Sequence, residues 1–187
     1  MAEMNWLSRW IVNLSNARRS ARILDTVGPK LSLPASARIL ELGAGRGGMS
    51  ALLQERFRPG RLAVTDFDPS QLEAARLNLT RRFGSLPPSI ELHRVDARAL
   101  PFEAASFDAV FAMVMLHHVE AHHFEYRERP KALAEIRRVL APGGLLTYSE
   151  FSRTAEMRGT LGELGFVPVF DQRGWRGRQL AVYRAPS

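Results

Sequence analysis

The sequence predicts an α/β fold in which seven strands form one doubly wound, mostly parallel sheet that ends in an antiparallel hairpin, with helices on both faces. Short apolar segments alternate with helical segments along the chain, which is typical of parallel strands connected by helices. A glycine-rich turn, Gly43–Gly48, follows the first strand and opens a helix. Only the short segment Gln172–Arg178 separates the last two strands, which is typical of a hairpin.

Strands are expected where β-branched and aliphatic residues cluster, at Arg38–Leu42, Leu62–Asp66, Ile90–Val95, Ala109–Met113, Leu145–Glu150, Val167–Asp171 and Gln179–Arg184. Helices are expected between them, at Gly47–Arg56, Pro69–Phe83, Pro130–Leu140 and Ala155–Leu164. A chain of 187 residues with 45% apolar content is long enough for one full-sized core. We therefore expect one domain at 29–187, preceded by a separate N-terminal element at 1–28.

The composition of the chain excludes several classes of protein. The chain has no cysteine, which excludes disulfides, cysteine-bound zinc and a cysteine nucleophile. No apolar run is long enough to cross a bilayer and no signal-peptide pattern is present, so a cytoplasmic protein is expected. Arginine dominates the basic residues behind the formal net charge of +7, which suits phosphate or carboxylate binding and equally a solvated basic surface.

The segment Ile39–Gly48 carries the most chemical information in the chain. It is an aliphatic strand that ends in an acid and runs into a turn rich in glycine, which allows positive φ and close approach of the backbone to a ligand. Doubly wound folds hold nucleotide-like cofactors at such a junction of strand and helix. No Lys-Ser or Lys-Thr follows the glycines, so the Walker pattern of nucleotide triphosphatases is absent.

The glycines alone fit two cofactors. Gly43, Gly45 and Gly48 satisfy the G-x-G-x-x-G pattern of dinucleotide-binding folds, and Asp66 follows at a distance suited to a ribose-binding acid. An NAD(P)-dependent oxidoreductase is therefore one hypothesis. Glu41 favours a different one, because its negative charge would repel a pyrophosphate and attract the cationic amino-acid end of S-adenosylmethionine (SAM).

From about Ala37 to its C-terminus, the chain resembles a class I SAM-dependent methyltransferase. The resemblance rests on four motifs in the order and spacing of that family, which are Glu41-Leu42-Gly43-Ala44-Gly45-Arg46-Gly47, Val64-Thr65-Asp66-Phe67-Asp68-Pro69, Asp96-Ala97 with Ser106-Phe107-Asp108-Ala109-Val110, and Val139-Leu140-Ala141-Pro142-Gly143-Gly144-Leu145-Leu146. It implies a Rossmann-like fold, SAM as cofactor, and a cofactor site formed by Glu41, Gly43, Ala44, Gly45, Gly47, Asp66, Phe67, Asp96, Ala97 and Met113.

The residue types suit these roles. The carboxylate of Asp66 can accept hydrogen bonds from both ribose hydroxyls, and that of Asp96 can accept one from the adenine amino group. The backbone N–H of Ala97 can face a ring nitrogen, and Met113 can supply an apolar surface. The alternative is that Asp66 and Asp96 only cap the helices that follow them.

Four histidines crowd the end of the fourth predicted strand, at His117, His118, His122 and His123. The resemblance places the methyl acceptor there, and histidine takes a proton near neutral pH, so His117 or His118 is predicted to orient the acceptor or act as a general base. Tyr148 and Glu150 are second candidates. A metal site of His118 and His122 with a nearby glutamate is the alternative; we expect no metal.

The segment Asn5–Val27 is predicted to form a helix with a basic flank, because apolar residues recur at spacings of three and four, at Leu7, Trp10, Leu14, Ala17, Ala21 and Leu24. Three interpretations are open. The helix packs on the core and covers the cofactor, docks on an anionic membrane or a lipid substrate, or forms a dimer seam. The second would make the protein membrane-peripheral.

The predicted function is therefore transfer of a methyl group from SAM to nitrogen or oxygen of a small molecule or lipid headgroup, by in-line displacement. A non-catalytic SAM-binding partner protein is one alternative. A methyltransferase of protein or RNA is another, although the Asn/Asp-Pro-Pro-Tyr/Phe motif of nucleic-acid N-methylation is absent, which makes a nucleic-acid substrate less expected.

Overall fold

The computed structural model describes residues 18–122, 125–174 and 178–187. The part of the predicted N-terminal helix that precedes residue 18, with Leu7, Trp10 and Leu14, lies outside the described residues, as do His123 and the tip of the last hairpin. Residues 18–27 are helical, as predicted for this part of the chain. The division into an element at 1–28 and a domain at 29–187 stays a prediction.

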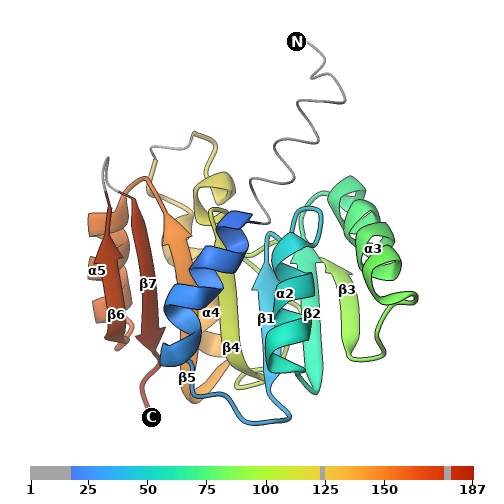
Figure 1. Cartoon of the computed structure of the whole chain (residues 1–187). Helices are drawn as coiled ribbons and strands as arrows, with labels where there is room; N and C mark the ends of the chain where they lie inside the picture. The colour runs from blue at the N-terminus through green and yellow to red at the C-terminus, as the bar shows by residue number, and fades with distance from the viewer. Residues whose placement is uncertain (1–17, 123–124, 175–177) are drawn as a thin grey trace.

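Within the described residues the strands form one seven-stranded sheet in the order β3-β2-β1-β4-β5-β7-β6 (Figure 1). The five strands from β3 to β5 are parallel to one another, and β7 is antiparallel to both β5 and β6. The predicted fold class is therefore confirmed. The strands are β1 (Arg38–Leu42), β2 (Arg61–Asp66), β3 (Ile90–Arg94), β4 (Phe107–Met113), β5 (Leu140–Glu150), β6 (Val167–Arg173) and β7 (Gln179–Arg184).

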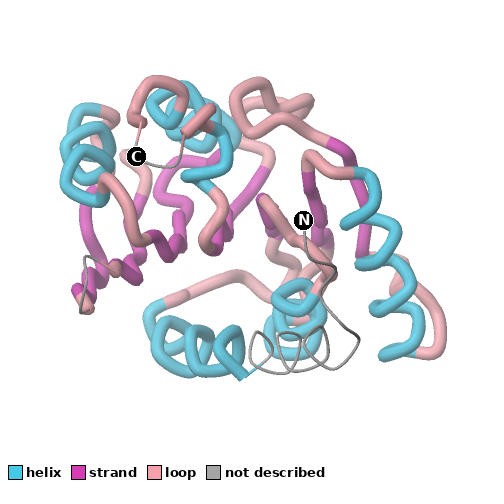
Figure 2. The backbone as a smooth tube through the Cα atoms, turned by 90° about the horizontal axis from the view of Figure 1, so that it is seen from above, coloured by secondary structure: helices cyan, strands magenta, loops and turns pink. Residues whose placement is uncertain are grey.

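Helices cover both faces of the sheet, as the view from above shows (Figure 2). On one face, the helix of residues 18–27 buries Leu24 and Val27 in the same apolar cluster as α2 and α3. On the other face, α4 and α5 bury their apolar residues against β4, β5 and β7. The helices are α2 (Gly48–Phe57), α3 (Pro69–Phe83), α4 (Arg129–Val139) and α5 (Thr154–Glu163), with the short 3-10 turns η1 (Gly28–Lys30) and η2 (Leu116–Val119).

The buried residues Leu24 and Val27 show that the end of the N-terminal helix packs on the core. This agrees with the packing part of the first interpretation for residues 18–27, while the covering of the cofactor stays a prediction. The membrane and dimer interpretations depend on residues outside the described part and stay predictions. None of the described helices has the length and apolar character needed to cross a bilayer.

The main boundary that the sequence misplaced is the start of β5. The strand was expected to begin at Leu145 and begins at Leu140, where it pairs with Phe107 before the register shifts. The turn residues Pro142 to Gly144 thus fall within the strand, because the chain pairs with β4 both before them, at Leu140, and after them, from Leu145. The turn η2 was also not predicted as an element.

The order of the strands decides where a site can form. The chain reverses its direction of travel across the sheet between β1 and β4, which are hydrogen-bonded neighbours. Doubly wound folds bind ligands in the crevice outside the carboxyl ends of the strands at such a switch point. In Figure 1 these ends lie at the upper edge, where η2 and the start of the helix of residues 18–27 also lie.

Candidate functional site

The glycine turn after β1 adopts the conformation that its composition predicts. Gly43, Gly45 and Gly47 have φ of +67°, +54° and +78°, a region that side chains with a Cβ avoid. The Ala44 N–H donates to the Thr65 carbonyl at 2.9 Å, and this bond ties the turn to β2. The turn ends at Gly47, which is the N-cap of α2.

Asp66, at the end of β2, is bonded to this turn. Its carboxylate accepts hydrogen bonds from the Gly45 N–H at 2.8 Å and from the Asp68 N–H at 3.0 Å. The cap of α3 is Asp68, whose side chain accepts from the Ser70 N–H at 2.8 Å. The interpretation of Asp66 as a helix cap is therefore wrong. The structure brings Asp66 and the glycines 43, 45 and 47 to the same edge of the sheet.

Glu41 lies beneath the turn and is buried. Its carboxylate accepts a hydrogen bond from the Ser50 hydroxyl at 2.5 Å. Burial raises the pKa of Glu41 to about 7; the Ser50 bond acts in the opposite direction, and the negative charge of Asp66 adds to the rise. Near neutral pH this carboxyl is poised between its neutral and charged forms.

Phe67 and Asp96 line the next part of the edge. The ring of Phe67 is 63% exposed, and the Arg94 guanidinium lies over it at 5.5 Å from the centroid. Asp96 pairs with Arg98 at 2.6 Å, and these hydrogen bonds hold the pKa of Asp96 below its usual range. No helix begins in the described segment 97–106, so the interpretation of Asp96 as a helix cap is also wrong. Ala97 is buried beside it.

Met113, at the end of β4, is partly buried against the apolar cluster that contains α2. The next methionine, Met115, lies closer to the glycine turn than the sequence indicated: a Cβ on Gly43 would be 2.5 Å from the Met115 Cβ. Glycine is thus required at position 43 for two reasons: the positive φ, and the lack of space for a Cβ beside Met115. This contact joins the turn after β1 to the segment after β4.

The two histidines of η2 differ in burial. His117 is buried and His118 is exposed, and their rings lie 4.0 Å apart between centroids. The Nδ1 atom of His117 is 2.9 Å from an Oε atom of Glu150, the last residue of β5. Phe151 packs on the other side, with ring centroids 4.6 Å apart. Glu150, which the sequence analysis named as a second candidate, is therefore the hydrogen-bonding partner of His117.

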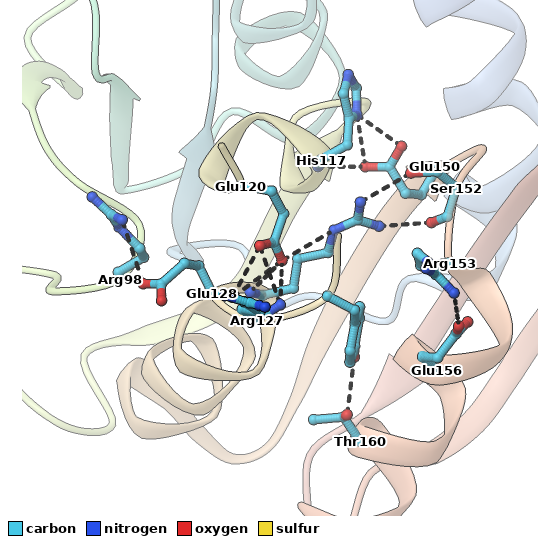
Figure 3. Close-up of polar contacts among 12 residues, drawn as sticks. Arg98, His117, Glu120, Arg127, Glu128, Glu150, Ser152, Arg153, Glu156 and Thr160 are labelled. Atoms are coloured by element: carbon cyan, nitrogen blue, oxygen red, sulfur yellow. Dashed lines mark hydrogen bonds and ion pairs between the residues drawn. The ribbon is translucent and has the colours of Figure 1, made fainter. Parts of the chain in front are cut away.

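A buried set of charged side chains supports this pair (Figure 3). The Glu120 carboxylate accepts hydrogen bonds from the backbone N–H groups of residues 127, 128 and 129 at 3.0–3.1 Å. The Arg129 side chain is fully buried and donates to the Ser152 carbonyl at 2.7 Å and to the Ser152 hydroxyl at 3.0 Å. Sequence reasoning missed Arg129 and Ser152, since a charged residue at a predicted helix start carries no sign that it will be buried.

Tyr148, the other second candidate, has different polar partners. It is buried, donates to the Gln179 side chain at 2.9 Å and stacks near Tyr183. Burial is also the largest cause that raises the pKa of Tyr148 above its usual value. These contacts give Tyr148 a role in joining β5 to β7.

Among the residues that the structure describes, no group of three or more histidines, aspartates or glutamates is arranged to hold a metal ion. His122 is exposed, and His123 lies outside the described residues.

The model of a family described as "Methyltransferase domain" matches residues 40–148, which include the glycine turn, Asp66, Asp96, η2 and most of β5. The chain belongs to this family. Membership confirms the resemblance seen in the sequence and SAM as the cofactor, and it favours SAM over a dinucleotide for the glycine turn.

Two curated relatives and one solved structure illustrate the similarity. A phthiotriol/phenolphthiotriol dimycocerosates methyltransferase of Mycobacterium leprae is 37% identical over 113 residues, covering 60% of this chain and 37% of that protein. A ubiquinone/menaquinone biosynthesis C-methyltransferase, UbiE, of Bordetella parapertussis is 31% identical over 150 residues, covering 77% and 51%. The structure of a SAM dependent methyltransferase from Aquifex aeolicus has a TM-score of 0.70 at 15% identity, covering 88% and 89%. The chain spans about half or less of the length of these curated relatives.

Proposed function

We propose that this methyltransferase-family protein transfers the methyl group of SAM to a lipid- or quinone-type small molecule. The observation that carries the proposal is the glycine turn after β1, with three positive φ angles and a hydrogen bond from Gly45 to Asp66, at the switch point of the sheet. The relatives support the acceptor class, since their names refer to dimycocerosates and to ubiquinone and menaquinone.

The cofactor is proposed to lie across the carboxyl ends of β1, β2 and β3. Each oxygen of Asp66 already accepts one backbone N–H and retains a lone pair for a ribose hydroxyl. Phe67 offers an exposed aromatic face beside it, and Asp96 with the Ala97 N–H is suited to the adenine edge. Glu41 in its charged form attracts the ammonium group of the methionine part.

The acceptor is proposed to lie beside η2 and the end of β5. Methyl transfer is an in-line displacement at a sulfonium, so the protein has to align the nucleophile and exclude water. His117 and His118 are the proposed catalytic residues at that place. Nitrogen and oxygen are the acceptor atoms expected from the sequence, and the C-methyltransferase among the relatives adds carbon as a candidate. Contact with a membrane surface through the N-terminal helix and the oligomeric state stay predictions.

The proposal is tested by incubating the protein with methyl-labelled SAM and a host-cell extract and counting label in the organic-solvent phase. We expect label in that phase. Label only in the aqueous phase would replace the lipid or quinone acceptor by a polar small molecule, and label in precipitated protein or RNA would support the macromolecular alternative. SAM binding without label in any fraction would favour the non-catalytic partner protein and contradict the proposal.

The cofactor site has a matched pair of variants. Asp66→Ala removes a carboxylate proposed to bind ribose, and we expect the affinity for SAM to fall by about 10- to 100-fold, on the order of one hydrogen bond lost to a charged group. Asp68→Ala removes a carboxylate two residues away that caps α3. Calorimetric titration with S-adenosylhomocysteine should show unchanged affinity for this variant. Equal affinities for both variants would contradict the assignment of Asp66.

A further inference from the structure

The contact between His117 and Glu150 joins two elements that are distant in the sequence. Besides the ring atom Nδ1 of His117, the carboxylate of Glu150 accepts the backbone N–H of His117 at 3.1 Å and that of Phe151 at 3.0 Å. Both side chains are at most 4% exposed. The carboxylate is thus held from three directions, and its position is set by the main chain on both sides of the site.

The geometry selects one form of the neutral imidazole ring. A carboxylate only accepts hydrogen bonds, so the ring nitrogen that faces it has to carry the hydrogen. Nδ1 of His117 therefore is the N–H atom, and Nε2 carries the lone pair. Figure 3 shows the far edge of the ring directed away from the carboxylate of Glu150.

We propose that Glu150 is a positioning residue that fixes His117 as the Nδ1–H tautomer, so that Nε2 takes the proton of the methyl acceptor. The acceptor then belongs to the class of nucleophiles that lose a proton on methylation, such as a hydroxyl, an ammonium group or an acidic C–H next to a carbonyl. This proposal rests on the proposed function and adds to it that the acceptor atom carries a proton before methylation.

The proposed step balances. The bond between the acceptor atom and its hydrogen breaks, and the electron pair of that atom forms the bond to the methyl carbon. The bond from that carbon to the sulfonium breaks, and its electrons stay on sulfur, which becomes the neutral thioether of S-adenosylhomocysteine. The proton passes to Nε2 of His117, and the resulting imidazolium faces the negative charge of Glu150.

The charges around His117 come from each element packed against it. Glu150 ends β5, His118 lies on η2 and Glu120 follows it, and Arg129 begins α4. Arg19, on the helix of residues 18–27, is close enough to Glu150 for their charges to interact, although its pKa is lowered overall, first by burial. Arg129 is close enough to interact with both Glu120 and Glu150. The carboxylate that faces the ring is thus itself held between cationic groups.

His118 differs from His117 in this respect. The His118 residue is exposed, and its ring packs against that of His117 at an interplanar angle of 41°. Exposure suits contact with an acceptor, whereas the buried and bonded ring of His117 suits a fixed tautomer. We therefore assign the proton to His117 and contact with the rest of the acceptor to His118.

The tautomer is measured directly by long-range 1H–15N NMR of the full chain, with His117→Asn used to assign the signals. We expect an Nδ1–H ring for His117 in the native protein and a shift toward the Nε2–H form in Glu150→Met. An Nε2–H ring in the native protein would overturn the proposal. This measurement needs neither SAM nor acceptor, so its outcome is independent of the proposed function.

Turnover is then measured with the labelled-SAM assay for Glu150→Met, Glu150→Gln and Glu150→Asp. We expect Glu150→Met to lower kcat by about 100-fold or more, the range of a lost general base, with the KM for SAM within about twofold of its native value. Glu150→Gln keeps a hydrogen-bond-accepting oxygen but no charge, so we expect a smaller loss of kcat. It also serves as a second variant if Glu150→Met fails to fold. Partial recovery in Glu150→Asp is expected, since it keeps the carboxylate.

The matched control is Tyr148→Phe, which removes a buried hydroxyl on the same strand that donates to Gln179 rather than to His117 or Glu150. We expect native turnover for it. Full turnover in both Glu150→Met and Glu150→Gln would overturn the positioning role. No transfer by the native protein, together with an intact Nδ1–H ring, would contradict the proposed function and leave the role of Glu150 in fixing the ring intact.

Discussion

The two halves of the candidate site are built in different ways. At the ends of β1 and β2, the site is made of backbone: three glycines with positive φ and main-chain N–H groups that donate to Asp66. At η2 and the end of β5, it is made of buried side chains, among them His117 and Glu150, which lie 33 residues apart in the chain. The first half depends on local conformation and the second on tertiary packing, so each should respond to a different kind of substitution.

The largest effect is expected where a buried charge loses its partner. Arg129→Met leaves the carboxylates of Glu120 and Glu150 without the guanidinium between them, and we expect a loss of about 3–5 kcal/mol in the free energy of unfolding. Arg82→Met breaks an exposed pair with Glu55 and should cost about 1 kcal/mol or less. Urea denaturation measures both, and equal losses would show that the buried charges contribute no more than surface ones.

A second prediction compares two glycines of the turn. Gly43→Ala and Gly45→Ala both place a Cβ at positive φ, at a cost of about 1–2 kcal/mol each. Only at Gly43 does the new Cβ meet the Cβ of Met115 at 2.5 Å, which adds about 1–3 kcal/mol of overpacking. Thermal unfolding should rank Gly43→Ala below Gly45→Ala. The reverse order would mean that the segment after β4 moves to make room for the new Cβ, and that the contact between Gly43 and Met115 does not join the two halves of the site.

The third prediction concerns the pH dependence of Glu41. Its pKa is raised from an ordinary 4.5 to about 7 in the fold, chiefly by burial. Between these two pKa values the folded state keeps the proton and the unfolded state loses it. The free energy of unfolding is therefore highest below about pH 4.5, and about 3 kcal/mol of it is lost as the pH rises from there through 7. Glu41→Gln should gain stability relative to the native protein across this window.

The same residue should make cofactor binding depend on pH. The ammonium group of SAM is proposed to pair with the charged carboxyl, so SAM affinity should rise as the pH increases through about 7, and Glu41→Gln should abolish this rise. Titrations at several pH values, with unfolding curves at each, measure both effects. Parallel pH profiles of the native and variant proteins would remove Glu41 from the cofactor site.

The smallest effect is expected at the cap of α3. Asp68→Ala removes the hydrogen bond to the Ser70 N–H and should lower the midpoint of thermal unfolding only slightly, because the cap is exposed. The measurement is the midpoint of thermal unfolding, with Ser70→Ala as a control that retains the backbone donor. A cost near that of Gly43→Ala would mean that Asp68 does more than cap the helix.

The sequence by itself determined the fold class and the positions of the cofactor motifs. Alternating apolar and helical segments predicted the parallel sheet, and the glycines at 43, 45 and 47 predicted a turn with positive φ, because these signals are local properties of the backbone. The identity of the α3 cap was decided by the structure, since Asp66 and Asp68 are both acids before a helix and only the geometry separates them.

The tertiary structure alone decided how the half of the candidate site at η2 and the end of β5 is assembled. Nothing local to His117 identifies Glu150 as its partner, or distinguishes the buried His117 from the exposed His118 beside it. Likewise, Arg129 and Ser152 meet only because α4 and α5 pack on the same face of the sheet. Burial and long-range pairing are consequences of packing many elements at once, and a single sequence carries no local record of them.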